Sequence, residues 1–294
     1  MAHDQTFKDL LRGFFHDFLT LFLPAIADGI DAASITFLDP QTFTDVPEGL
    51  MRIADLVAEA RTFDGAPELV LLHTEAQTEP EADLAYRMWE YNALLTLRRR
   101  RPAISAVLLP FSGRGGVRKA RYVETLFGEE YIKLEYWRIE LPSLLAEDYA
   151  AGVSLLGVAL AALMRPGPGG RAALKIDIVR RLRESDLDEA RLFLLVNVVE
   201  TYLTLDEAEQ VDYRARLQQE EGGEDMEATE LTWADRIAMR TRREDVKQVI
   251  ELKFGRVSPE IAALIDAADT AASMTALLAR VVAAETEEQL LPAT

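Results

Sequence analysis

The chain has 294 residues, with no cysteine and three histidines. The absence of cysteine excludes disulfides, cysteine nucleophiles and thiolate metal sites, and three histidines argue against a His-rich zinc site. The composition, 49% hydrophobic and 28% charged residues, is typical of a globular protein long enough for two domains, and the net charge of −18 argues against nucleic-acid binding by the surface as a whole.

The N-terminus shows no basic segment followed by an apolar one, so we predict no signal peptide. The uncharged run over residues 149–164 is shorter than the roughly 20 residues that a membrane-spanning helix needs. Its many Ala and Gly residues favour a buried helix instead. We therefore expect a cytoplasmic protein without a membrane partner.

The first predicted elements are a helix and two strands. Residues 4–23 are predicted to form an amphipathic helix, because apolar residues recur with the spacing of one helical face and Pro24 ends the pattern. A short strand is expected over residues 34–38. A second strand, predicted over residues 52–61, carries Asp55 near its middle.

The strand predicted over residues 69–77 follows a turn signal, so we expect it to form a hairpin with the strand before it. Side chains alternate along a strand, which places His73, Glu75 and Gln77 on one face. A carboxylate and an amide on one face of a buried strand indicate that a polar or charged group is held there. With Asp55 on the neighbouring strand, Glu75 could form a carboxylate site for a hard divalent cation.

Less specific interpretations of these residues stay open. Asp55 could be a surface acid on an exposed strand face, and Glu75 could pair with a nearby arginine. His73 is more often a satisfied, partly buried histidine than a functional one.

A second helix is predicted over residues 81–99, followed by a buried strand over residues 103–110, a loop at residues 113–116 and a last strand over residues 131–141. The inner face of the helix carries four apolar residues: Leu84, Met88, Tyr91 and Leu95. The order of helix, three strands, helix and strand predicts an α/β fold. The economical arrangement is a mixed sheet flanked by helices.

From about residue 144 onward the chain is predicted to be all helical, with a break at residues 165–170 and an acidic loop or linker at residues 218–230. Three further helices are expected over residues 233–253, 259–268 and 274–291. The predicted domain organisation is an α/β domain over residues 1–145, a helical region with the linker over residues 146–230, and a small helical domain over residues 231–294.

Basic residues concentrate in one part of this acidic chain. Residues 98–121, which we call the basic stretch, contain no acid and the following cations: Arg98, Arg99, Arg100, Arg101, Arg114, Arg118, Lys119 and Arg121. Four consecutive arginines exceed what a helix C-terminus needs, so the stretch is a candidate for contact with a phosphate backbone. The alternative is a solvated helix end, stopped by Pro102. We identify no aromatic platform for single strands and no base-reading helix.

Several short motifs follow one another within the first 145 residues. They are His3-Asp4-x-x-Phe7-Lys8, Ala54-Asp55-Leu56, Leu72-His73-Thr74-Glu75-Ala76-Gln77 and Tyr86-Arg87-Met88-x-x-Tyr91. In this order the chain resembles the PD-(D/E)XK nuclease superfamily, and within it the Rpn family of recombination-promoting, transposase-like nucleases. Residues 249–291 are similar to the helical domain of unknown function that follows some members.

The resemblance implies a restriction-endonuclease-like αβββαβ core and a metal-dependent DNA endonuclease that hydrolyses phosphodiester bonds. Asp55 and Glu75 match the metal-binding carboxylates, and the carbonyl of Ala76 completes the ligand set for Mg²⁺, or for Mn²⁺ or Ca²⁺. Gln77 stands where the superfamily usually has a catalytic lysine. An amide can orient water but supplies no positive charge.

The implied partner is double-stranded DNA, contacted through its backbone. Besides the basic stretch, Lys8 and Arg87 are candidate DNA contacts and could supply the charge that Gln77 lacks. Their alternatives are solvated surface for Lys8 and a pair with a carboxylate for Arg87.

Three functions are open, in this order of preference. The first is the metal-dependent DNA endonuclease. The second is a catalytically inactive nuclease fold that binds DNA or protein, which Gln77 and the acidic balance favour. The third is an assembly module whose C-terminal helices form a homo-oligomer. The chain has no P-loop, Rossmann glycine fingerprint, Gly-x-Ser-x-Gly or His-Glu-x-x-His motif, which argues against other enzyme classes.

Overall fold

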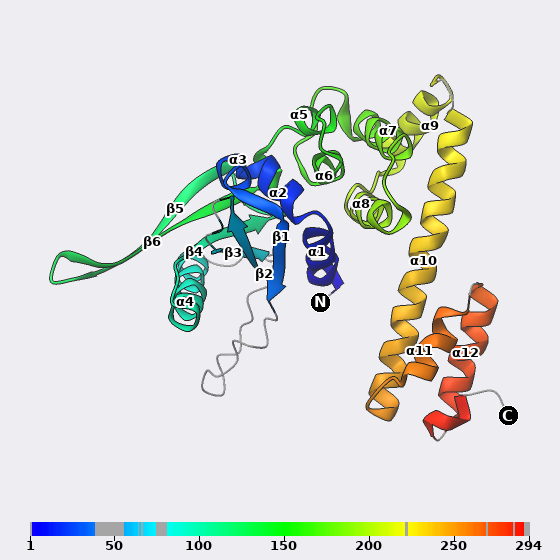
Figure 1. Ribbon diagram of the computed structural model, residues 1–294. Coiled ribbons are helices and arrows are strands. Elements are labelled where there is room, and N and C mark those ends of the chain that lie inside the picture. The colour runs from blue at the N-terminus through cyan, green and yellow to red at the C-terminus, as the bar shows by residue number, and fades with distance from the viewer. Residues whose placement is uncertain are drawn as a thin grey trace. The chain divides into compact units, whose positions relative to one another are not determined.

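A computed structural model (Figure 1) describes residues 2–38, 56–63, 65, 67–74, 81–220, 223–268, 270–284 and 286–290. The chain divides into two compact units, Met1–Glu221 and Gly222–Thr294. The domain boundaries predicted at residues 145 and 230 stay predictions.

The first unit contains a six-stranded mixed sheet with the strand order β1-β2-β3-β4-β6-β5. The strands are β1 (Ile30–Leu38), β2 (Leu56–Thr62), β3 (Pro67–Thr74), β4 (Ala103–Leu109), β5 (Val117–Leu126) and β6 (Glu129–Glu140). β4 runs parallel to both β3 and β6, and the other pairings are antiparallel. The predicted α/β class with a mixed sheet and the β2–β3 hairpin are therefore confirmed. The predicted strand ends at residues 52–55 and 75–77 lie outside the described residues.

Helix α4 (Glu81–Arg99) connects the parallel strands β3 and β4 and covers one face of the sheet. Its predicted inner face is confirmed, since all four residues are buried: Leu84, Met88, Tyr91 and Leu95. The first two pack with Val107 and Tyr136, and the last two pack with Val57 and Leu38. α4 therefore runs back along the sheet from the end of β3 to the start of β4.

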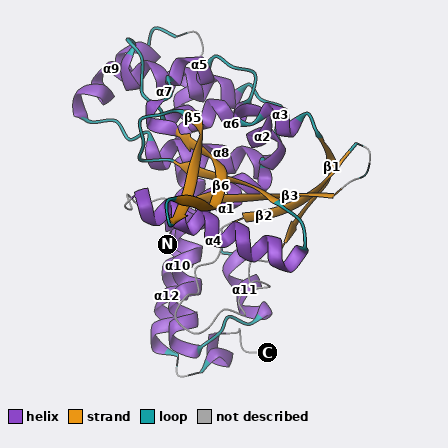
Figure 2. Ribbon diagram, turned by 90° about the vertical axis from the view of Figure 1, so that its left-hand side faces the viewer, coloured by secondary structure: helices purple, strands orange, loops and turns teal. Residues whose placement is uncertain are grey.

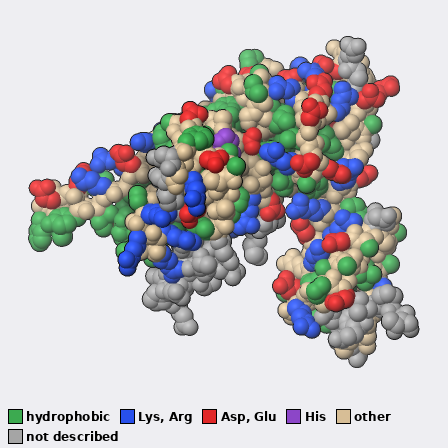
Figure 3. All heavy atoms as spheres, viewed as in Figure 1, with side chains coloured by type: hydrophobic (Ala, Val, Ile, Leu, Met, Phe, Trp, Pro, Cys, Tyr) green, Lys and Arg blue, Asp and Glu red, His purple; other side chains and the backbone are tan. Residues whose placement is uncertain are grey.

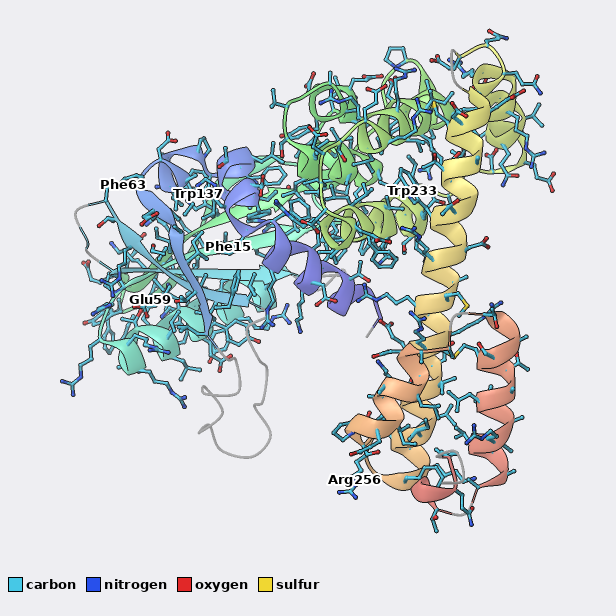
Figure 4. The ribbon with its side chains drawn as sticks, turned by 45° about the vertical axis from the view of Figure 1, so that its right-hand side comes forward. Phe15, Glu59, Phe63, Trp137, Trp233 and Arg256 are labelled. Carbon is cyan, nitrogen blue, oxygen red and sulfur yellow. The ribbon has the colours of Figure 1, made fainter. Side chains whose placement is uncertain are left out.

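Helices α1 (Ala2–Gly13), α2 (Phe15–Phe22) and α3 (Pro24–Ala27) replace the single helix predicted over residues 4–23. The break falls at Phe14, whose backbone leaves helical geometry and whose buried ring lies 4.3 Å from the Arg191 guanidinium carbon. A periodic apolar pattern continues through such a break, so the sequence did not reveal it. Phe15, labelled in Figure 4, meets Phe37 of β1 edge to face at 5.4 Å, on the face opposite α4.

Strand β5 is an element that sequence reasoning missed, since no strand is predicted between the loop at residues 113–116 and the last strand over residues 131–141. β5 forms the edge of the sheet and pairs with β6 along its whole length. Both faces of the outer hairpin are exposed, so its residues show no clean alternation of apolar and polar side chains.

The rest of the first unit is helical, as predicted. Its helices are α5 (Ala146–Ala150), α6 (Leu155–Leu160), α7 (Gly170–Arg183), α8 (Glu189–Tyr202) and α9 (Glu207–Leu217). The break at residues 165–170 is confirmed, and α6 is buried from Leu156 onward. In Figure 2 the strands run between α4 and the group of helices α5 to α8. Within the described ranges, no helix combines the length and the apolar character needed to cross a membrane.

Helix α8 begins with a side-chain cap, because Asp188 Oδ1 accepts the Arg191 N–H at 2.9 Å. Asp188→Ala is expected to lower the free energy of unfolding by about 1 kcal/mol, since that N–H would lose its partner. Urea denaturation measures the change. Asp186→Ala is the matched control, because this exposed acid lies before the cap and should leave the midpoint unchanged. Equal effects of the two variants would contradict the assigned cap.

The second unit consists of α10 (Gly223–Phe254), α11 (Pro259–Asp266), α12 (Ala271–Ala283) and a short 3₁₀ helix (Glu287–Leu290). These elements enclose a small core of their own, which includes Ile250, Ile261 and Val281. Two expectations are corrected. Most of the acidic stretch at residues 218–230 is helical, because Glu224 and Asp225 occupy the first turn of α10, where carboxylates favour a helix. The last helix ends at Ala283 rather than near residue 291.

Candidate functional site

The strand pairing brings several chain segments to one edge of the sheet. Leu56 at the start of β2 pairs with Leu72 near the end of β3, and Thr74 pairs with Leu108 near the end of β4. The start of β2 and the ends of β3, β4 and β6 therefore lie together, and we call this side of the sheet the carboxyl edge. The opposite side, where β3 and β4 begin, is the amino edge.

The predicted metal and catalytic residues adjoin the carboxyl edge through the chain. Asp55 directly precedes Leu56, and Glu75 directly follows Thr74. Asp55, Glu75, Ala76 and Gln77 themselves lie outside the described residues. His73 is described through its backbone and lies opposite Val107 in the β3–β4 register.

A buried ion cluster stands at the same edge, where β6 ends. Glu140 is 1% exposed, and its Oε1 lies 2.8 Å from Arg138 Nε and 3.1 Å from Arg118 Nη2. The other carboxylate oxygen accepts the N–H of Gly115. Two guanidinium groups thus approach one carboxylate. A charge removed from water needs such partners.

The glycine-rich loop between β4 and β5 closes around this cluster. Gly113 has a φ of +99°, and a Cβ built there would stand 2.5 Å from Glu140 Cδ. A Cβ at Gly115 would stand 2.3 Å from Arg118 Nε. The loop is also tied to the chain after β6, because the Gly116 N–H donates to Ser143 Oγ at 2.8 Å. The glycines are required here by the close approach of backbone and buried side chains.

The loop presents basic side chains at the carboxyl edge. Arg114 is exposed, and the side chain of Arg118 is 40% exposed although it pairs with Glu140. Lys119, the next residue of β5, pairs with Glu135 at 3.6 Å and lies 5.4 Å from the ring centroid of Trp137. Arg114 and Arg118 are therefore the residues of the basic stretch that lie at the carboxyl edge with part of their side chains exposed.

Lys8 and Arg87 belong to helices on the two faces of the sheet. Lys8 is half-buried and follows Phe7, whose ring lies 6.1 Å from that of Phe111, just after β4. Arg87 lies in the first half of α4, near the carboxyl edge, and is only 7% exposed. Its burial removes it from the surface that a duplex could touch. A buried guanidinium favours the alternative role of Arg87, a pair inside the protein.

The four consecutive arginines lie at the opposite edge. Residues 98–101 are exposed and end α4 just before β4 begins. Arg101 Nη1 lies 3.7 Å from Glu59 of β2 (labelled in Figure 4). In Figure 3, Lys and Arg side chains gather over this part of α4. The basic stretch of the sequence is therefore split between the amino edge and the carboxyl edge.

Sequence reasoning missed Arg138 and Glu140. The available signal was an arginine and a glutamate two residues apart at the end of a strand with an apolar residue between them, which places both charges on one strand face. Among the residues that the structure describes, no three acidic or histidine side chains gather as a metal site.

Comparisons of the chain with protein-family models, curated proteins and solved structures give no match.

Proposed function

We propose that the chain is a metal-dependent DNA endonuclease with a restriction-endonuclease-like core over residues 1–145. The observation that supports it most is the strand pairing, which brings the start of β2 and the end of β3 to the carboxyl edge. Asp55 and Glu75 are the residues next to these two strand ends. The proposed reaction, metal-dependent hydrolysis of phosphodiester bonds, is the one that the resemblance of the motifs to the Rpn family implies.

The donor set fits a hard divalent cation. Two carboxylates, from Asp55 and Glu75, and the carbonyl of Ala76 are oxygen ligands of the kind that Mg²⁺, Mn²⁺ and Ca²⁺ prefer. A cation held there would supply a Lewis acid and a water of lowered pKa.

The remaining roles, orienting the attacking water and binding the DNA backbone, belong to side chains of the protein. Gln77 orients the attacking water through its amide, while Arg114 and Arg118 bind the phosphate backbone of a duplex. Their guanidinium groups offer bidentate contacts and supply the charge that Gln77 lacks. Because these contacts are electrostatic, DNA binding should weaken with added salt.

The test is cleavage of a supercoiled plasmid with Mg²⁺, Mn²⁺ or EDTA. Asp55→Ala and Glu75→Ala are each expected to reduce the nicking rate by on the order of 10²-fold or more, as for removal of other groups that stabilise a transition state. Glu135→Gln is the matched control, since this exposed acid lies on the outer hairpin, and its rate should equal that of the wild type.

Gln77 favours one alternative, a nuclease fold that binds DNA without cleaving it. Equal inactivity of wild type and variants, together with a gel shift that survives in all of them, would reject the endonuclease and support this binding module.

A further inference from the structure

The β5–β6 hairpin forms an arm that extends past the rest of the sheet (Figure 1). β4 pairs with β6 only from Trp137 to Glu140, so the hairpin before Trp137 is paired only with itself. Tyr122 stacks on Trp89 of α4 at 5.7 Å and supports the base of the arm. Beyond it, residues 124–131 are all exposed. We call residues 121–135 the arm.

The tip of the arm has a strained backbone and exposed apolar side chains, both of which are unusual on a stable protein surface. Phe127 and Gly128 have φ values of +52° and +85°, a two-residue turn in which Asn-Gly is the favoured pair. Phenylalanine in the left-handed region costs conformational free energy. The Phe127 side chain is also 95% exposed, beside Leu126 at 52% and Tyr131 at 66%, and Figure 3 shows this apolar group at the end of the hairpin. A strained and exposed aromatic residue points to a partner that covers it.

The charge of the arm indicates the kind of partner. Its two cations, Arg121 and Lys133, stand against four carboxylates, those of Glu124, Glu129, Glu130 and Glu135. Lys133, through a hydrogen bond and its charge, lowers the pKa of Glu130, so this carboxylate stays ionised. An acidic arm is repelled by nucleic acid and by anionic lipid, and it is attracted to a basic protein surface.

The chain carries a surface of that kind at the end of α4. We call Leu97 and the four arginines after it the arginine patch. Leu97 is 75% exposed, and all four arginines are exposed. Arg100 has a φ of +53° at a helix end where glycine or asparagine is favoured. Among the residues that the structure describes, Arg100 and Phe127 are the non-glycine residues with positive φ.

We propose that the arm of one copy docks on the arginine patch of a second copy, with Phe127 against Leu97 and the arm carboxylates against the arginines. Both surfaces are exposed, so the chain does not cover its own patch with its own arm. β5 runs antiparallel to β6 and leads away from the carboxyl edge, so arm and patch extend toward the same side of the sheet. A two-fold axis on that side could form both contacts at once. The proposal does not rest on endonuclease activity.

The test is the mass of the full chain by analytical ultracentrifugation over a range of concentrations. Phe127→Asn is the main variant, because asparagine suits the left-handed turn and should keep the fold. The wild type is expected to dimerise, and Phe127→Asn and Arg99→Glu should each weaken dimerisation about tenfold or more, as for a central interface residue. Val153→Asn, a change at a residue that is 96% exposed away from both surfaces, should leave the mass unchanged.

Mixing the variants tests reciprocity. Phe127→Asn keeps an intact patch and Arg99→Glu keeps an intact arm, so their heterodimer contains one wild-type contact, which neither homodimer has. Because the two changes fall on the same contact and a lost contact cannot be lost again, the mixture should form the heterodimer more readily than either variant forms a homodimer. The proposal is overturned by a wild type that stays monomeric at about 10⁻⁴ M. It is equally overturned by a dimer that Phe127→Asn leaves intact, which would assign the contact elsewhere, for example to the C-terminal helices. Loss of duplex or anionic-vesicle binding in Phe127→Asn, without a change in mass, would also overturn it.

Discussion

Glu140→Gln is expected to lower the free energy of unfolding by about 3 kcal/mol, because a neutral amide would replace the buried carboxylate that lies against Arg138, Arg118 and the Gly115 N–H. The glutamine keeps the size of the side chain, so the change removes the negative charge and one of the two acceptor oxygens without opening a cavity. Arg118 is 40% exposed and can be solvated again, so the loss comes mainly from Arg138. Urea denaturation at equal m-values measures the change.

Glu135→Gln is the matched control on the same strand. Glu135 also faces a cation, Lys119 at 3.6 Å, but both side chains are more than half exposed. Exposed pairs contribute little, so we expect a change below about 0.5 kcal/mol. If the two glutamine variants unfold at the same urea concentration, the charge of Glu140 is not needed to compensate Arg138.

Gly113→Ala is expected to cost about 3 kcal/mol of stability for two reasons. A residue with a side chain is strained at a φ of +99°, and the new Cβ would collide with Glu140, whose side chain is held by three donors. Because the loop carries Arg114, the variant should also bind duplex DNA more weakly than the wild type under conditions where both are folded. Denaturation and a gel shift measure the two effects.

Gly128→Ala is the control that separates the backbone strain from the collision with Glu140. Gly128 has a similar φ of +85°, but nothing lies within 4 Å of a Cβ built there. Its substitution should therefore show only the strain, about 1 kcal/mol. The excess cost at Gly113 should shrink, but not vanish, when Glu140 is also replaced by alanine, because Cγ and Cδ of Glu140 are then gone while the Cβ at that position, 2.7 Å from the new one, remains. If Gly113→Ala and Gly128→Ala lower the free energy of unfolding equally, the loop at residues 113–116 can shift to avoid the collision with Glu140.

Local sequence signals predicted much of the fold. The bounds predicted for α4 agree with the structure, because the spacing of its apolar residues is regular and Pro102 follows directly after the arginines. The β2–β3 hairpin was predicted from the turn residues between two apolar runs. Both features depend on residues that are close together in the chain, which is where such patterns are reliable.

The remaining features depend on contacts that a single sequence does not reveal. β5 has no apolar alternation, because the outer hairpin is exposed on both faces. Arg138 and Glu140 gain their role only when the loop at residues 113–116 folds over them. The arginines at residues 98–101 and Arg114 are close in sequence, yet β4 runs between them and places them at opposite edges of the sheet.

The position of β6 between β4 and β5 also constrains how the sheet can assemble. β5 and β6 are joined by a two-residue turn, so their pairing needs only the closure of a short loop, which has a small entropic cost. β6 meets β4 through four register pairs, from Ala106↔Trp137 to Leu109↔Glu140. The hairpin can therefore pair before it joins the sheet. The two strands beyond β4 are then gained or lost as one unit, through this four-residue ladder and the packing of Tyr122 and Tyr136 against α4.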